Sequence, residues 1–401
     1  MRRDLGGDNH PEMIVVIPAF NESMIFETLH ALHASSNSAR VMVIIVVNYS
    51  EVARDSVKQF NEVLYNVLQE WQDIYSIPQL YFRTLLAPNR RRKHAGAGLA
   101  RKIGMDTAVD VFFRNNTIDG IIISLDADCL VKENYLNTIY HHFKNERDTD
   151  VSVIDFQHRS DLWDTRVQEA IKKYELYLNY YVLGCRAAGF PFAYHTVGSA
   201  FALRSGAYVK FGGMNKKHAG EDFYFLHKLF TNGKTSRIYE TTVFPSARLS
   251  ARVPFGTGPA LKNILEKDDE LSVYHPDAFR DLQQFYQHIP DMYEHDNAFE
   301  NVQVSALKSF FEIINFSGII REGRSNSASK RQFEKRILTR FDAFQLVKYL
   351  NYAHNYGYYK KIPVIAASTE LLGIDIKGKN IDLVLKKARE LERINHPRQL
   401  R

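Results

Sequence analysis

The expected fold is decided by residues 121–128, which read Ile-Ile-Ile-Ser-Leu-Asp-Ala-Asp. Such an apolar, β-branched run is typical of a central strand that is buried on both faces. Asp126 and Asp128 are therefore expected together at the carboxyl end of that strand, where open α/β sheets bind their ligands. Two carboxylates at this spacing suit a hard divalent cation, which takes phosphate oxygens and waters as further ligands. An acidic turn that caps the strand is the alternative interpretation.

Apolar runs of strand length alternate with helical patterns along the first third of the chain. This alternation predicts a mostly parallel sheet with helices on both faces. In the third helix the apolar residues at 105, 108, 109 and 112 form one stripe that would pack on the sheet. The expected strands are Met13–Ile17, Val41–Val47, Leu80–Leu85 and Ile121–Leu125, and the expected helices begin near Ser23 and Val52 and cover Gly98–Phe113.

Strand and helix signals continue beyond residue 150. Val151–Phe156 is expected to be a further strand, Gly198–Gly213 a strand with a turn, and Phe223–Phe230 a helix. A helix of about twenty residues is expected before residue 190, because apolar side chains recur at helical spacing. The members of its apolar face are Val167, Ile171, Tyr174, Leu178 and Tyr181.

The last part of the chain has a different pattern. Beyond about residue 260 the strand signal fades, and apolar and charged residues recur at helical spacing. Gly323–Ser329 is the best candidate for a loop there. We therefore expect a flexible N-terminus over residues 1–12, an α/β domain over 13–260 and a mainly helical region over 261–401.

The composition argues against several classes of protein. The 52 basic and 46 acidic residues give a net charge of +6, a mild surplus without any helix-turn-helix or zinc pattern, so nucleic-acid binding is not expected. The two cysteines, Cys129 and Cys185, make no disulfide framework, and the first residues lack an apolar signal segment, so a cytoplasmic location is expected. No apolar run is long enough to span a membrane, and peripheral contact with its inner face stays open.

Two further motifs fall where strands or helices are expected to meet a ligand. Residues 17–22 read Ile-Pro-Ala-Phe-Asn-Glu, and the proline is expected to stop the strand so that Asn21 and Glu22 lie at the carboxyl edge. Residues 89–101 combine a basic run with glycines that lead into a helix, whose free N–H groups would bind phosphate beside Lys93 and Arg101. A capped turn and a solvated charge run are the respective structural alternatives.

Two more motifs lie farther along the chain. Glu221 and Asp222 stand at the expected start of a helix, where a carboxylate serves as a cap or, in a transferase, as the base that deprotonates a hydroxyl. Residues 248–258 read Arg-Leu-Ser-Ala-Arg-Val-Pro-Phe-Gly-Thr-Gly. The arginines of this segment, Arg248 and Arg252, would bind a pyrophosphate, and an ordinary turn is the alternative.

These motifs, taken in order, resemble family 2 glycosyltransferases with the GT-A fold. The order is the Ile-Pro-Ala-Phe-Asn-Glu turn, the basic helix start, the Asp-x-Asp strand end, a Gly-Ser-x-Phe-Ala-Leu-Arg strand and the Glu-Asp pair, and it covers residues 13–258. The resemblance implies a Rossmann-like sheet with a nucleotide-sugar across its carboxyl edge. Residues 13–260 would then be the catalytic domain, and residues 261–401 would serve an acceptor, a partner or a membrane surface.

The resemblance also implies roles for the matching residues. Asp128 would be the more direct ligand of Mn²⁺ or Mg²⁺, and Asp126 would lie toward the ribose and the metal. Asp222 would be the general base, with Glu221 orienting the acceptor or a loop. The residues implied in nucleotide-sugar binding are Pro18, Ala19, Asn21, Glu22, Asn48, Lys93, Arg101, Asp126, Gly198, Ser199, Arg248 and Arg252.

The implied activity is metal-dependent, inverting hexosyl transfer from a nucleotide-sugar, with UDP favoured, to a hydroxyl acceptor in bacterial-type polysaccharide or glycolipid assembly. Asn48 stands where the family usually has an acidic residue that holds the base or ribose, so the nucleotide stays open. The Gln-x-x-Arg-Trp motif of processive synthases is absent, which favours transfer of a single sugar. The alternatives are a sugar nucleotidyltransferase, a non-catalytic nucleotide-sugar-binding module and a lipid-surface scaffold.

Overall fold

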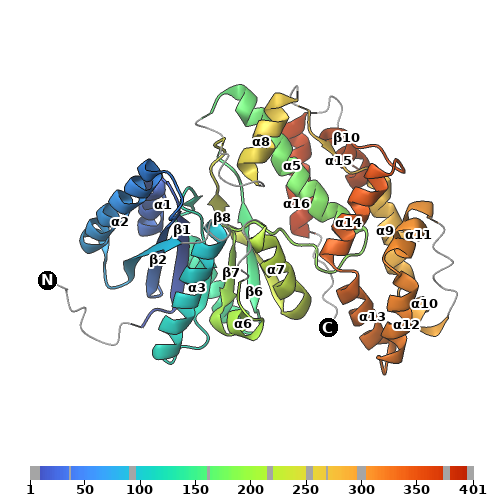
Figure 1. Ribbon diagram of the computed structural model, residues 1–401, viewed down its shortest axis with the longest axis horizontal. Coiled ribbons are helices and arrows are strands. Elements are labelled where there is room, and N and C mark those ends of the chain that lie inside the picture. The colour runs from blue at the N-terminus through green and yellow to red at the C-terminus, as the bar shows by residue number, and fades with distance from the viewer. Residues whose placement is uncertain are drawn as a thin grey trace. The chain divides into compact units, whose positions relative to one another are not determined.

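The computed structural model of this chain contains an eight-stranded sheet, whose strands lie between residues 13 and 244 (Figure 1). The strands are β1 (Met13–Ala19), β2 (Val41–Ser50), β3 (Leu80–Asn89), β4 (Ile121–Ser124), β5 (Leu130–Val131), β6 (Val151–Phe156), β7 (Phe201–Arg204) and β8 (Thr235–Phe244). Their order across the sheet is β3-β2-β1-β4-β7-β6-β8-β5. Strand β7 is antiparallel to both neighbours and β5 to β8, whereas the other neighbouring strands are parallel. The predicted α/β class with a mostly parallel sheet is confirmed.

The packing of the chain separates it into two units. Unit 1 comprises Met1–Leu162 and Thr196–Pro259, and it contains the sheet. Unit 2 comprises Trp163–His195 and Ala260–Arg401. The chain therefore leaves unit 1 and later returns to it. The structure describes residues 10–35, 38–89, 96–159, 163–214, 220–249, 256–267, 270–295, 304–373 and 380–394.

Strands β1, β2 and β4 form the buried centre of the sheet. Every residue of β1 and β4 is buried, and so is every residue of β2 except the last. This is the burial expected of β-branched strands with helices on both faces. In the parallel register Val16 lies beside Ser124, and Ala19 lies beside Val47. The loops that follow β1, β2 and β4 therefore leave the same edge of the sheet.

Strand β1 continues past the proline that is predicted to stop it. Pro18 pairs in register with Val46, and β1 ends at Ala19. The pairing of β1 with β4 ends at Val16, so β1 has only one neighbouring strand at Pro18. A proline without an N–H group is tolerated where one side of a strand needs no partner. The prediction that the strand stops at Pro18 is therefore wrong, because β1 extends two residues beyond the expected Ile17.

Helices flank the sheet of unit 1 (Figure 1). Those of unit 1 are α1 (Ile25–Ala34), α2 (Asp55–Tyr75), α3 (Ala97–Arg114), α4 (Tyr135–Asn145), α6 (Ser205–Lys210) and α7 (Glu221–Asn232), and α8 (Thr257–Glu266) begins at its end. Helix α3 packs on β1 and β2, and α2 packs on β2 and β3. Met105, Ala108 and Phe112 of α3 are buried, as the apolar stripe predicts.

Some elements of unit 1 differ from the prediction. Strands β5 and β8 and helix α4 were not expected, and residues 205–210 form helix α6 instead of a continued strand. Tyr208 of α6 is buried, and its hydroxyl donates to Asp106 Oδ1 of α3 at 2.6 Å, so packing against α3 overrides the local alternation. Gly212 and Gly213 have φ angles of +74° and +61° and form the expected turn.

Unit 2 is mainly helical, in line with the predicted helical C-terminal region. Its helices are α5 (Thr165–Ala187), α9 (Pro276–His288), α10 (Asp291–Glu294), α11 (Ser305–Ile313), α12 (Phe316–Ser325), α13 (Lys330–Arg340), α14 (Ala343–Asn355), α15 (Val364–Leu372) and α16 (Ile381–Ile394). Strands β9 (Ser272–Val273) and β10 (Ile362–Pro363) form a small antiparallel pair. Buried aromatic rings make its core: Phe311 stacks on Phe316 with centroids 4.4 Å apart, and Phe285 lies 4.8 Å from Phe341.

Two predictions within unit 2 need correction. Helix α5 buries Val167 and Ile171 of its predicted face, but it also buries Leu176 and Tyr180, because α9, α15 and α16 all pack against it. The loop predicted at Gly323–Ser329 is shorter, because α12 extends through Ser325. A Cβ atom at Gly323 would lie 3.1 Å from the Phe333 ring, so this glycine serves close helix packing instead of a turn. Within the described part of the chain, no helix has the length and apolarity to cross a membrane.

Candidate functional site

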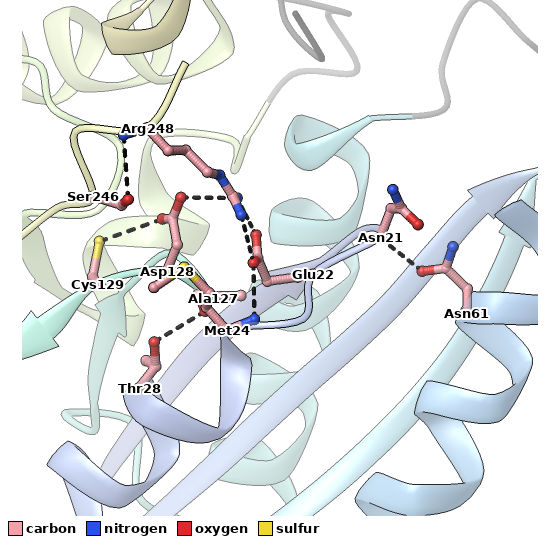
Figure 2. A network of polar contacts seen from close by, with 10 residues as sticks. All are labelled: Asn21, Glu22, Met24, Thr28, Asn61, Ala127, Asp128, Cys129, Ser246 and Arg248. Atoms are coloured by element: carbon pink, nitrogen blue, oxygen red, sulfur yellow. Dashed lines mark hydrogen bonds and ion pairs between the residues drawn. The ribbon is translucent and has the colours of Figure 1, made fainter. Parts of the chain in front are cut away.

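Asp126 and Asp128 follow β4 at the carboxyl edge of the sheet. The backbone between them is held from α1, where the Thr28 hydroxyl donates to the Ala127 carbonyl oxygen at 3.0 Å (Figure 2). The buried thiol of Cys129 donates to Asp128 Oδ1 at 3.9 Å. Burial, with Asp128 and Asp126 nearby, raises the pKa of that thiol. Cys129 therefore stays protonated and donates to the side chain of Asp128 in the acidic turn.

Arg248 joins the turn after β1 to the turn after β4. Its Nη1 donates to Glu22 Oε1 at 2.8 Å, and its Nη2 donates to Asp128 Oδ2 at 3.0 Å and also to Glu22 Oε2. Figure 2 shows the guanidinium between the two carboxylates. Glu22 is 3% exposed. The sequence places Arg248 in a pyrophosphate-binding loop, and in this structure its charge compensates two acids at the sheet edge.

The turn after β1 is held from two directions. Asn21 has φ +49°, a conformation that asparagine tolerates better than most residues. Its backbone N–H donates to Asn61 Oδ1 of α2 at 3.0 Å. The backbone N–H of Met24 donates to Glu22 Oε1 at 3.2 Å. Ala19, predicted to contact the nucleotide, is fully buried at the end of β1.

Arg101 of α3 connects the acidic turn after β4 with the start of α7. Its Nη2 donates to Asp126 Oδ1 at 2.7 Å, and its Nη1 donates to Glu221 Oε1 at 2.7 Å. Burial disfavours the charged guanidinium, but the carboxylates of Asp126, Glu221 and Asp222 outweigh this and raise the pKa of Arg101 above its ordinary value. Arg101 is 3% exposed. Its partners in the structure are carboxylates, whereas the sequence predicts a phosphate.

Asp222 and Glu221 form the first turn of α7, after Gly220 in the left-handed conformation with φ +67°. Asp222 Oδ1 accepts from the backbone N–H of Phe223 at 2.8 Å. Burial raises the pKa of Asp222 to about 6, Arg101 opposes the rise, and Glu221 adds to it. A carboxylate with this pKa is ionised at neutral pH and accepts a proton more readily than an ordinary aspartate.

The segment around Gly198 passes directly over this cluster. A Cβ atom at Gly198 would lie 2.9 Å from Asp222 Oδ2 and 3.0 Å from Arg101 Nη2, so the close approach requires glycine. The Gly198 carbonyl oxygen accepts from the buried hydroxyl of Ser124 at 2.7 Å, which ties the segment to the end of β4. Ser199 is also buried, at 2% exposed.

Asn48 occupies the end of β2, at the same edge of the sheet. Its Nδ2 donates to the Gly96 carbonyl oxygen at 3.1 Å, immediately before α3 begins. Its Oδ1 is buried and has no hydrogen-bond partner among the described residues. The predicted contact of Asn48 with a nucleotide stays a prediction.

The carboxylates of Asp126 and Asp128 suit a divalent cation whose other ligands would be phosphate oxygens and waters. Burial raises the pKa of Asp128 to about 6, and the charges of Asp126 and Glu22 add to the rise while Arg248 opposes it. In the part of the chain that the structure describes, no three or more His, Cys, Asp or Glu side chains are grouped to hold a metal. Mg²⁺ is typically held by one or two carboxylates with phosphate oxygens and waters. Asp126 and Asp128 match that pattern.

Comparison with known proteins identifies part of the chain. Residues 121–262 match the family model described as glycosyl transferase family group 2. The resemblance to family 2 glycosyltransferases is confirmed there. The matched segment includes Asp126, Asp128, Glu221, Asp222 and Arg248. No curated protein matches the chain by sequence.

Solved structures give only distant likenesses. TarS 1-349 from S. aureus in complex with UDP-GlcNAc has a TM-score of 0.41 and 13% identity, over 95% of this chain and 91% of that one. GalNAc-T7 with UDP, GalNAc and Mn²⁺ has a TM-score of 0.37 and 18% identity, over 77% of this chain and 55% of that one. TM-scores this low support no inference about substrate.

The glycosyltransferase motifs reveal the acids of the site but miss the contacts that join them. The pairing of Arg101 with Glu221 spans 120 positions, and that of Arg248 with Glu22 spans 226. No local pattern marks the supporting roles of Asn61 and Ser124. Two predicted nucleotide-binding residues, Lys93 and Arg252, lie outside the described residues.

Proposed function

We propose that this protein transfers single sugars from a nucleoside diphosphate donor to a hydroxyl acceptor with inversion, and that UDP is the favoured nucleotide. One observation carries the proposal. Two acidic pairs, Asp126 with Asp128 and Glu221 with Asp222, meet through Arg101 at the carboxyl edge of the sheet. That edge is where α/β sheets bind ligands, and the glycosyltransferase match covers both pairs.

Asp222 is the proposed general base. It takes the proton of the acceptor hydroxyl as that oxygen attacks the anomeric carbon, on the face opposite the diphosphate. The bond from the anomeric carbon to the diphosphate oxygen breaks, and the nucleoside diphosphate leaves with the electron pair. Attack from the opposite face inverts the anomeric configuration. A pKa of about 6 suits the base. Asp222 is still ionised near neutral pH, and it has a higher proton affinity than an ordinary aspartate.

Asp128 and Asp126 are the proposed ligands of Mn²⁺ or Mg²⁺. The ion would stabilise the negative charge that develops on the leaving diphosphate. Arg248 pairs with both Asp128 and Glu22, with Nη2 at 3.0 Å from Asp128 Oδ2. We propose that the Arg248 guanidinium would add positive charge beside the diphosphate of a bound donor.

The biological setting is proposed from the same family resemblance. We propose transfer of a hexose to a sugar or glycolipid acceptor in polysaccharide assembly, in the cytoplasm or at the inner face of a membrane. Residues 261–401 would then shape the acceptor site, bind a partner or contact the membrane surface.

A thermal-shift panel tests the donor assignment. UDP-, GDP- and dTDP-sugars are compared with and without Mn²⁺, on the wild type and on Asp128→Ala. At a donor concentration of about 100 Kd, binding stabilises the native state by about 2.7 kcal/mol. We expect a UDP-sugar to raise the midpoint only with Mn²⁺, and Asp128→Ala to lose the effect. The proposal is wrong if no nucleotide-sugar shifts the wild type and Asp128→Ala behaves identically.

A further inference from the structure

Arg101 is a buried cation shared by acids from two separate elements. Asp126 follows β4 and Glu221 begins α7, and each accepts one hydrogen bond of 2.7 Å from a different terminal nitrogen of the guanidinium. The side chain of Arg101 is 4% exposed. A planar guanidinium fixes the separation of two carboxylates, whereas a lysine ammonium presents a single point charge. The geometry therefore depends on arginine and not merely on a positive charge.

The surrounding backbone is shaped to admit this arrangement. A Cβ atom at Gly98, in the first turn of α3, would lie 2.7 Å from Glu221 Cδ. A Cβ atom at Gly198 would lie 3.0 Å from Arg101 Nη2. Glycine at both positions lets the backbone close on the guanidinium and its partner from two sides. Arg101 and Glu221 consequently have little room to adopt another rotamer.

The charge of Arg101 is also required locally. Three carboxylates, Asp126, Glu221 and Asp222, act electrostatically on this one guanidinium. Removing one member of a buried ion-paired group leaves the others uncompensated, which is costly. The acids would then repel one another and move apart. This movement disturbs the metal side and the acceptor side of the site together.

We propose that Arg101 is a positioning residue that sets the distance between the metal-binding acid Asp126 and the acceptor-side pair Glu221–Asp222. The inference rests on the proposed function and replaces the expected nucleotide contact of Arg101 with a different role. Displacement of reacting groups by about 1 Å costs on the order of a hundredfold in rate. A positioning role therefore lowers kcat, whereas loss of a donor contact raises the KM for the nucleotide-sugar.

The exchange Arg101→Lys is the principal test, because it keeps the positive charge but removes the planar guanidinium that donates to two carboxylates. Lys102→Arg is the matched control: it is the reciprocal exchange at the next position of α3, where Lys102 Nζ pairs with Asp106 Oδ2 at 2.7 Å on the surface. We expect Arg101→Lys to lower kcat about a hundredfold with little change in donor KM. It should also weaken Mn²⁺ binding in the presence of UDP, measured by calorimetry. Lys102→Arg should match the wild type in every measurement.

A double-variant cycle with Glu221→Gln isolates the mechanism. If Arg101 acts through Glu221, the loss of kcat in the double variant is smaller than the product of the two single losses. A higher donor KM at unchanged kcat would instead make Arg101 a nucleotide contact and overturn the inference. A lower thermal midpoint at unchanged kcat and Mn²⁺ affinity would reduce it to an ordinary buried ion pair, which also overturns it.

The outcomes separate this inference from the proposed function. If the wild type transfers sugar and Arg101→Lys behaves like Lys102→Arg, only the positioning role fails. If the wild type neither binds a nucleotide-sugar with Mn²⁺ nor transfers one, the proposed function fails and the inference fails with it. Should Arg101→Lys not fold, Glu221→Gln decides: a lower kcat at constant donor KM supports the role of Arg101, and an unchanged kcat overturns it.

Discussion

At the scale of single residues, the ionisation of Asp222 would govern the proposed transfer. Burial is the main reason that its pKa rises to about 6, and Arg101 limits the rise. Above that pH the carboxylate is ionised and can accept a proton from an acceptor hydroxyl. As the pH falls through about 6, Asp222 takes up a proton and loses its capacity as a base. The pH dependence of transfer should therefore have an acidic limb in this range.

We predict that Asp222→Asn lowers kcat by about 10²- to 10⁴-fold, because the amide cannot accept the proton. Donor affinity, measured by thermal shift with a UDP-sugar and Mn²⁺, should change little. In the wild type the rate should fall as the pH drops below about 6, and the residual rate of Asp222→Asn should lack this limb. Asp110→Asn, which removes a surface carboxylate paired with Arg114 at 2.9 Å, is the control and should resemble the wild type.

The residues of the site show what a sequence can reveal about chemistry. Asp126 and Asp128 are predictable because they come directly after a run of buried β-branched residues. The ionic partners of Asp126 and Asp128 are not predictable in this way. Arg101 and Arg248 appear in the sequence as basic residues suited to phosphate, and their pairing with carboxylates depends on how distant segments fold together.

At the scale of elements, the placement of α3 on the sheet decides where Arg101 points. Gly104 lies one turn after Arg101 and faces the sheet, where a Cβ atom would be 2.3 Å from Val16 Cγ1 and 3.2 Å from Val46 Cγ2. These neighbours belong to central strands and are fully buried. The helix can approach the sheet this closely only with glycine at position 104.

We predict that Gly104→Ala destabilises the protein by about 1 to 3 kcal/mol, because the added methyl group overpacks the interface of α3 with β1 and β2. Chemical denaturation measures the loss. Gly206→Ala is the matched control, since Gly206 is also helical and its nearest neighbour to a Cβ atom is Ile118 O at 3.8 Å. That exchange should be neutral or slightly stabilising. Equal effects of the two exchanges would contradict the close packing of α3.

The elements also show why some predictions fail. Strands β1, β2 and β4 are long apolar runs, and their type follows from sequence alone. Strand β8 carries charged residues such as Arg237 and Glu240, so its pattern resembles a surface segment until its pairing with β6 is known. The sequence of α6 resembles a strand because its apolar residues alternate. The segment is helical because it packs against α3, a contact that a local window of sequence does not contain.

At the scale of the whole molecule, the chain builds two cores. The core of unit 1 lies around the sheet, and that of unit 2 is a cluster of aromatic rings. The segment 163–195 belongs to unit 2 although it interrupts unit 1 in the sequence. No local pattern in the sequence indicates that residues 163–195 belong to unit 2, because membership of a unit is defined by packing between distant residues.

Two separate cores lead us to predict that thermal unfolding is not two-state. Phe341 is fully buried, and its ring centroid lies 4.8 Å from that of Phe285 and 5.7 Å from that of Phe311. Phe341→Ala should cost about 3 to 5 kcal/mol, because it removes a ring from the centre of unit 2. Calorimetry should then show one transition lowered by roughly 10 °C and the other unchanged.

The exchange Gly104→Ala supplies the reciprocal measurement, because it acts on the core of unit 1. Gly104→Ala should lower the midpoint of the transition that Phe341→Ala leaves unchanged. A nucleotide-sugar with Mn²⁺ should raise the midpoint of that same transition, because every proposed donor-binding residue lies in unit 1. A single transition that moves equally with both exchanges would mean that the units unfold as one. Donor stabilisation of the transition that responds to Phe341→Ala would place part of the donor site among the helices of unit 2.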